Sequence, residues 1–277
     1  VRNLIKAGTY SETYKVSDDN GFDLFLKLYI NRLTPDKLFS DGEVAEIRHC
    51  RSISHKNIIR FIDSGTLNLE AGECQWMVTN YFTGELLSEK IFREGKVAVE
   101  EAVSIFTGIL EGLKYLHHMR LIHNDITPRN VMLASGTDMT PEIIDMGHVS
   151  KRVGGNPYFD TADLNPLYCA NRTFIGIYEE ETDIFSAIAV FYTMLFGHAP
   201  WNVDFRDGMM RAEKVAAVKA ARKNALELSG VNLPDNIRLI LEQGLSQDKD
   251  GGFDDIDRIL SILAGKREED PTSFSRS

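Results

Sequence analysis

The spacing of apolar residues in this 277-residue chain changes about one third of the way along. Near the N-terminus, ETYKVSD and FDLFLKLYI alternate apolar and polar residues around a turn at residues 18–21, a pattern typical of paired strands. PDKLFSDGEVAEIRHCRSI, which follows this pair, has helical spacing, and NIIRFIDSGTLN and ECQWMVTNYF after it predict two more strands. We therefore expect a sheet with one helix in this part of the chain.

From residue 100 onward the apolar spacing is helical. EEAVSIFTGILEGLKYLHHM and DIFSAIAVFYTMLFG predict core helices, and further helices are expected over residues 209–229 and in DNIRLILEQGL. The change of period predicts an α+β fold with a small β-rich lobe over residues 1–82 and a larger α-helical lobe over residues 83–265. The polar tail, residues 266–277, is expected to be disordered.

Composition limits the class of protein. A chain that is 43% hydrophobic and 26% charged is typical of a soluble globular protein, and its apolar runs are too short to predict contact with a membrane. The net charge of −10, without any Lys/Arg cluster longer than three, argues against a nucleic-acid partner. Cys50, Cys74 and Cys169 lack metal-site spacing, so we expect reduced thiols and a cytoplasmic location. The start at Val1 suggests a domain of a larger multidomain protein.

One polar segment stands between two apolar runs. LIHNDITPRNVML, residues 121–133, brings an imidazole, a carboxylate, a proline and a carboxamide together within the eight positions 123–130. The segment taken alone fits a simple turn. It also fits a helix start capped by Asp125, although Pro128 is then awkwardly placed. The segment alone does not decide between these structures and a functional loop.

HNDITPRN resembles the catalytic loop of protein kinases, H-R-D-x-x-x-x-N. Asp145 in IIDMG is similar to the Asp of the D-F-G motif, and Lys27 in LFLKLY to the strand lysine of the V-A-I-K motif. Glu46 precedes the SHKNII segment with the spacing of the kinase helix-C glutamate, and Asp183 lies where an Asp braces the catalytic loop. These ordered matches cover almost the whole chain and imply the two-lobed fold of the protein kinase superfamily.

The resemblance implies phosphoryl transfer from ATP with Mg²⁺. It makes Asp125 the residue that accepts the proton of the attacking hydroxyl, and Asn130 and Asp145 the metal ligands. It makes Lys27 the phosphate-binding lysine, aligned by Glu46, and gives His123 a structural role. The residues that it places around the nucleotide are Gly8, Phe25, Lys27, Thr79, Tyr81, Phe82 and Met132.

Several positions depart from the family pattern. The glycine-rich loop is reduced to KAGTYS, in which only Gly8 remains, and Phe25 replaces the usual Ala above the adenine ring. Asn124 replaces the Arg that receives an activation-loop phosphate, so phosphorylation at Tyr158 or Thr161 is not expected to be the activating switch. Arg172 replaces the Glu of the A-P-E motif, and the late segment that should carry its Arg partner has none, so that ion pair is expected to be lost.

Three functions remain open. The first is an ATP-dependent protein kinase acting on Ser or Thr of a protein substrate, which an activation segment of about 25 residues and the Asp183 helix favour. The second is a pseudokinase that serves as a binding or regulatory module, which the depleted glycine loop and Phe25 favour. The third is a small-molecule kinase of the aminoglycoside or choline kinase type, since those enzymes share the H-x-D-x-x-x-x-N loop.

Overall fold

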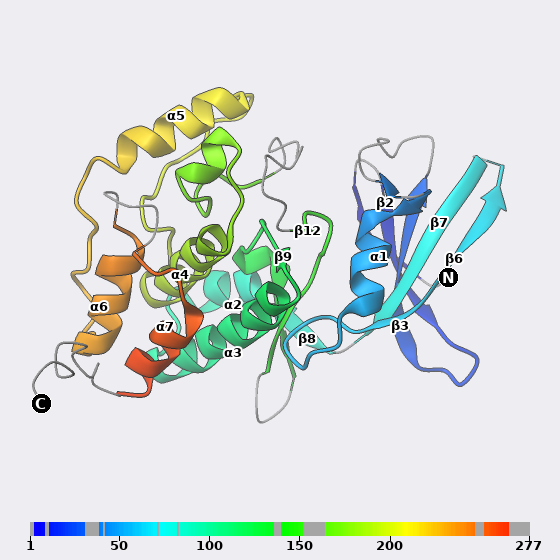
Figure 1. Cartoon of the computed structure of the whole chain (residues 1–277), viewed down its shortest axis with the longest axis horizontal. Helices are drawn as coiled ribbons and strands as arrows, with labels where there is room; N and C mark the ends of the chain where they lie inside the picture. The colour runs from blue at the N-terminus through cyan, green and yellow to red at the C-terminus, as the bar shows by residue number, and fades with distance from the viewer. Residues whose placement is uncertain are drawn as a thin grey trace, which may run out of the picture.

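The structure is a computed structural model of the chain and describes residues 3–8, 11–30, 39–40, 42–70, 72–81, 83–135, 140–151, 164–246 and 252–265. A five-stranded sheet forms one end of the molecule, and a group of helices forms the other (Figure 1). The predicted α+β class is confirmed. The described helices include none that is both long enough and apolar enough to cross a bilayer.

The sheet of the first lobe has the strand order β1-β2-β3-β7-β6, with every neighbouring pair antiparallel. Its strands are β1 (Asn3–Ala7), β2 (Ser11–Ser17), β3 (Asp23–Ile30), β6 (Phe61–Leu69) and β7 (Gly72–Asn80). The predicted turn between β2 and β3 forms because Asp18 Oδ1 accepts hydrogen bonds from the backbone N–H groups of Asn20 and Phe22. This hairpin fixes the register that places Lys27 opposite Thr13 on β2 and Met77 on β7.

The helix expected from residue 35 to residue 53 is shorter than predicted. Helix α1 (Ala45–Ser52) is preceded by two short paired strands, β4 (Phe39–Ser40) and β5 (Glu43–Val44), and residues 35–38 lie outside the described chain. The Gln75 side chain on β7 accepts a hydrogen bond from Val44 N and donates one to Gly42 O. Because a distant side chain bonds this backbone, and Gly42 adopts a φ of +79°, the helix cannot begin earlier.

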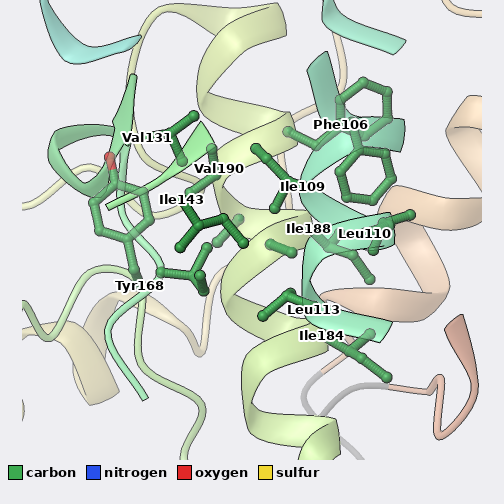
Figure 2. Packing of buried hydrophobic residues seen from close by; sticks show 14 of the residues in the cluster. Phe106, Ile109, Leu110, Leu113, Val131, Ile143, Tyr168, Ile184, Ile188 and Val190 are labelled. Carbon is green, nitrogen blue, oxygen red and sulfur yellow. The ribbon is translucent and has the colours of Figure 1, made fainter. Parts of the chain in front are cut away.

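The second lobe is built on two helices, α3 (Val99–His118) and α4 (Glu180–Phe196). Every residue of α4 from Thr182 to Phe196 is buried, because the helix is apolar on all sides and other elements surround it. The rings of Phe106 and Phe191 stack with centroids 4.3 Å apart where the two helices meet. Figure 2 shows this core, in which side chains of α3 lie against Ile184 and Ile188 of α4.

Shorter elements surround these two helices: α2 (Leu87–Glu94), α5 (Arg211–Ala221), α6 (Asp235–Gly244) and α7 (Ile256–Leu263). The helix predicted over residues 209–229 is therefore wrong in length. The chain leaves the helix after residue 221. Tyr192 Oη on α4 donates a hydrogen bond to Glu227 O, and this bond holds the segment around Glu227 against α4 without helical bonds. Helices α2 and α7 were not predicted, since each has only eight residues.

A small sheet of β8 (Gly84–Leu86), β10 (Val131–Ala134) and β11 (Pro141–Ile143) lies beside α3, between the two lobes. Helix α3 approaches it closely at Gly108, where an added Cβ would stand 2.4 Å from Pro141 Cγ. Asn57, in the loop after α1, donates from Nδ2 to Pro141 O, so the first lobe is tied to the same strand. This junction positions the polar loop that precedes β10.

Candidate active site

The polar loop of residues 123–130 connects β9 (Leu121–Ile122) to β10. It ends in a single 3-10 turn, Pro128–Asn130, in which the proline occupies the first turn. The residue before that turn is Thr127, whose side chain makes no capping bond. A helix capped by Asp125 is therefore wrong, and the loop is held by other contacts.

Asp183, in the first turn of α4, provides most of those contacts. Its Oδ2 accepts hydrogen bonds from His123 N at 2.8 Å and stands 2.9 Å from His117 Nε2, while its Oδ1 accepts from Asn124 N at 2.8 Å. Asn124 has a φ of +70°, a conformation that Asn tolerates better than most residues. A fully buried carboxylate with three partners thus fixes the loop to the most buried helix of the molecule.

His123 is completely buried beneath the loop. Its Nδ1 accepts a hydrogen bond from Asp125 N at 3.2 Å, and burial lowers the pKa of the ring. A neutral ring that bonds the backbone of Asp125 supports that residue without presenting a proton to the cleft.

Lys27 joins the two lobes at the centre of the site. Its Nζ lies 2.8 Å from both carboxylate oxygens of Glu46 on α1 and 3.2 Å from Asp145 Oδ1, which follows β11. Burial alone would lower the pKa of Lys27, but the charges of Asp145 and Glu46 outweigh burial and raise it above its ordinary value. The Lys27 charge in turn holds the pKa of Asp145 well below its usual range. Lys27 and Asp145 are therefore both charged at neutral pH.

Asp125 and Asn130 form a second group beside this one. Asn130 Nδ2 donates to Asp125 Oδ2 at 2.7 Å and to Asp125 O at 2.8 Å, and His148 Nδ1 lies 3.8 Å from the same carboxylate. Burial raises the pKa of Asp125, although the nearby His148 acts in the opposite direction. A carboxylate with a raised pKa, oriented by an amide, is suited to accept a proton.

The donor set fits Mg²⁺ shared with phosphates. The described residues contain no cluster of three or more His, Cys, Asp or Glu side chains that would hold a metal ion alone. Asn130 bonds Asp125 through its nitrogen, so its hard carbonyl oxygen is the atom left for a cation, and Asp145 offers a carboxylate. Two oxygen ligands from the protein, completed by phosphates and water, are what Mg²⁺ ordinarily uses.

The predicted adenine site is lined by aromatic side chains. Phe25, on the same face of β3 as Lys27, lies against Tyr81 with ring centroids 4.7 Å apart. Lys15 Nζ stands 4.1 Å from the centroid of the Tyr81 ring. Thr79 is buried behind them, while Met132 on β10 is half-buried. Phe82 lies outside the described residues.

The reduced glycine loop lies between β1 and β2. Gly8 is exposed, and its N–H donates to Ser11 O at 2.8 Å, so this donor is used within the turn. Lys6, at a position where the family has glycine, places Nζ 3.9 Å from Asp145 Oδ2 with 71% of its side chain exposed. An exposed cation therefore lies where the family has a glycine, and the charge of Lys6 was not predicted to belong to the site.

Asn124 has a structural function that its sequence position did not reveal. Its Nδ2 donates to His148 O at 2.7 Å and to Ser150 Oγ at 3.0 Å, and it lies 3.3 Å from Ile122 O. These bonds join the loop to β12 (Ser150–Lys151), which pairs with β9. A neutral amide thus connects the loop to the segment after Asp145. Tyr158 and Thr161 lie outside the described residues.

The segment around Arg172 also makes contacts that differ from the family pattern. The family's ion pair between the A-P-E position and the late part of the lobe was expected to be lost, and the described residues instead pair Arg172 with Glu179, just before α4. Arg222, after α5, is almost fully buried and donates to Cys169 O at 2.6 Å and to Asn171 Oδ1 at 2.8 Å. The prediction that an ion pair is simply lost was incomplete, because other cations bond this segment.

The chain has a strand-rich lobe and a helical lobe, and a lysine, a glutamate and two aspartates lie between them. This arrangement defines a two-lobed kinase domain. The chain matches the protein kinase domain family over residues 2–250 and belongs to that family.

Its similarity to individual relatives is low. It is 29% identical over 170 residues to Calcium-dependent protein kinase 5 of Plasmodium berghei (strain Anka), covering 61% of this chain and 29% of that protein. It is 26% identical over 250 residues to Calcium-dependent protein kinase 3 of Plasmodium yoelii yoelii, covering 87% of this chain and 43% of that protein. It is 28% identical over 216 residues to Serine/threonine-protein kinase H1 of Homo sapiens, covering 76% of this chain and 49% of that protein. The chain thus spans less than half the length of these relatives.

Proposed function

We propose that this domain transfers the γ-phosphoryl group of ATP, with Mg²⁺, to a Ser or Thr hydroxyl of a protein substrate. The observation that carries the proposal is the position of Lys27, whose amine contacts Glu46 and Asp145 at once. In the free chain these contacts bring the phosphate-binding cation, its aligning carboxylate and a metal ligand to one place. Phosphoryl transfer depends mainly on such positioning and charge neutralisation.

Each group then has one task. Lys27 would bind the α- and β-phosphates, and Asn130 and Asp145 would hold Mg²⁺, which would neutralise charge on the phosphates. The substrate hydroxyl oxygen bonds to the γ-phosphorus while the bond to the β-phosphate oxygen breaks, and ADP leaves. The hydroxyl proton passes to Asp125, whose raised pKa favours this step. Ser or Thr specificity is proposed from the names of the relatives, which include serine/threonine kinases.

Control by activation-loop phosphorylation is not part of the proposal. Asn124 stands where an arginine would receive the phosphate, and its amide nitrogen already bonds His148 O and Ser150 Oγ. An amide cannot form the charge-assisted, two-pronged contact that a guanidinium makes with phosphate. We propose that the loop is held in its working position by these neutral bonds.

The setting of the domain is also proposed. The three cysteines are buried free thiols, in keeping with a reducing, cytoplasmic compartment. The matched stretch is less than half of the relative in each of the three comparisons above, in keeping with a domain of a larger protein.

A second candidate, a pseudokinase that does not use ATP, is favoured by the Phe25–Tyr81 contact. In that reading the two rings fill the slot where the adenine base would lie. Stacking of a base on an aromatic ring contributes about 1–3 kcal/mol, and extra volume in a packed slot costs a similar amount, so magnitudes alone do not separate the two readings.

Calorimetry with Mg-ATP on the wild type and on Phe25→Ala separates the two. Binding to the wild type, with a change of no more than about tenfold in the variant, is expected if Phe25 rotates or stacks on the base. If only the variant binds ATP, Phe25 plugs the site and the pseudokinase reading holds.

A further inference from the structure

Helix α5 differs in charge from the rest of the chain. Residues 211–223 contain five Lys or Arg and one Glu, a net charge of +4, whereas the whole chain carries −10. The helix lies at the outer edge of the helical lobe, on the far side from the strands (Figure 1). A cationic helix on an acidic protein directs anionic partners to one place on its surface.

The end of this helix borders a recess of about 330 Å³. Its lining residues are Asn171, Lys219, Arg222 and Lys223. Lys219 lies in the last turn of α5 and Lys223 lies just after the helix; both are exposed and both line the recess. Three of the four lining side chains are therefore cationic, and the fourth is an amide.

One lining residue of the recess, Arg222, is held by several contacts. Arg222 is 3% exposed, and its guanidinium donates to Cys169 O and Asn171 Oδ1. Its central carbon lies 5.0 Å from the centroid of the Phe185 ring and 5.2 Å from that of Trp201. These contacts hold a positive charge beneath the opening, so that an anion above it meets a cation already in position.

Cations near a helix C-terminus also have a simpler explanation, since they interact favourably with the helix dipole. That effect accounts for one lysine in the last turn. It does not account for a concave site around the cations, nor for a buried arginine that bonds a different segment of the chain. Phe174 has its ring 5.5 Å from Lys219 Nζ, and the next residue in the chain, Ile175, is an apolar side chain that is 68% exposed.

We propose that this recess, with Ile175 beside it, is a docking site for an acidic segment of a protein partner that carries an apolar residue next to its Asp or Glu side chains. The two exposed lysines pair with the carboxylates, Arg222 adds a fixed positive charge, and Ile175 packs against the apolar residue. Because the rest of the chain is acidic, it repels the same segment elsewhere, which makes the site selective. A nucleic acid is disfavoured, since a long polyanion would extend from α5 onto acidic surface.

The test measures binding of a dye-labelled peptide of Glu, Asp and Leu to the full chain by fluorescence anisotropy. The peptide has no hydroxyl residue and cannot be a kinase substrate, so the result does not depend on the proposed function. Lys219→Gln/Lys223→Gln removes two charges from the recess. Lys56→Gln/Lys96→Gln removes two from exposed lysines elsewhere and is the matched control. None of these side chains is buried, so folding is expected to be preserved.

Binding should weaken on the order of tenfold in Lys219→Gln/Lys223→Gln, remain within about twofold in the control, and fall as salt is added. A peptide with Gln and Asn in place of Glu and Asp should bind neither the wild type nor either double variant. Equal binding by the two double variants, equal binding of the uncharged peptide, or no binding to the wild type would each overturn the proposal. Tighter binding of a single-stranded RNA than of the peptide, lost in the same variant, would assign the recess to nucleic acid and overturn it too.

Discussion

Replacing Lys27 with Met should destabilise the fold strongly, because two carboxylates depend on its charge. Glu46 is 7% exposed, and Lys27 itself only 20%, so water cannot replace the lost cation. Removing one partner from a buried ion pair costs about 3–5 kcal/mol. In a domain of this size that corresponds to a fall in melting temperature on the order of 10 °C.

The size of the effect should depend on pH in a defined direction. Lys27 holds the pKa of Asp145 below its usual value, so the wild-type pair contributes stability above about pH 4 and loses it as the pH falls. In Lys27→Met the largest cause that lowers the pKa of Asp145 is gone, while burial still raises that pKa and Lys6 and His148 still lower it, so the pKa of Asp145 is expected to rise. The folded variant then takes up protons readily. Its loss of stability relative to the wild type should therefore be largest near neutral pH and smaller toward about pH 5.

Thermal unfolding of the wild type and the variant at about pH 5 and about pH 7.5 measures both effects. Lys15→Met is the matched control. Lys15 lies on the neighbouring strand, and its partner Asp23 is more exposed than Glu46, the partner of Lys27. Its melting temperature should change much less. A Lys27→Met melting temperature within about 2 °C of wild type at neutral pH would refute the electrostatic description of the site.

Two further predictions concern control and nucleotide binding. Phosphatase treatment should leave activity nearly unchanged, because Asn124 offers no cation to a phosphate at Tyr158 or Thr161; a large loss that rephosphorylation restores would show that another cation receives that phosphate. Lys6→Ala should raise the KM for ATP by about three- to tenfold with little change in kcat, since Lys6 Nζ lies 3.9 Å from Asp145, the proposed metal ligand, and would add positive charge near bound phosphates; an unchanged KM would remove Lys6 from the site.

The strands and the long helices could be predicted because local pattern and burial agree there. The β2–β3 hairpin has its own turn residues, and α4 is apolar on every side. The start of α1 could not be predicted, because it is decided by Gln75 on a strand that comes later in the chain. The end of α5 is decided in the same way by Tyr192.

The candidate site was predictable where residue type and chemistry coincide, as at Lys27, Glu46, Asp125, Asn130 and Asp145. The residues that were missed act through contacts that no local pattern encodes. Lys6 was noted only as a missing glycine, yet its chain reaches Asp145. The cations of residues 211–223 are separated in sequence, so a search for Lys/Arg runs overlooks them, although the fold brings Lys219 and Lys223 to one recess.

The most direct test of the account is transfer of labelled phosphate from γ-labelled Mg-ATP to a generic protein substrate, with autophosphorylation measured alongside. The wild type should transfer label to Ser or Thr. Asp125→Asn, in which the amide cannot accept the hydroxyl proton, should retain nucleotide binding and lose about 10²–10⁴-fold in turnover. Equal turnover by the wild type and Asp125→Asn, or no transfer by a wild type that binds Mg-ATP, would contradict the proposed function.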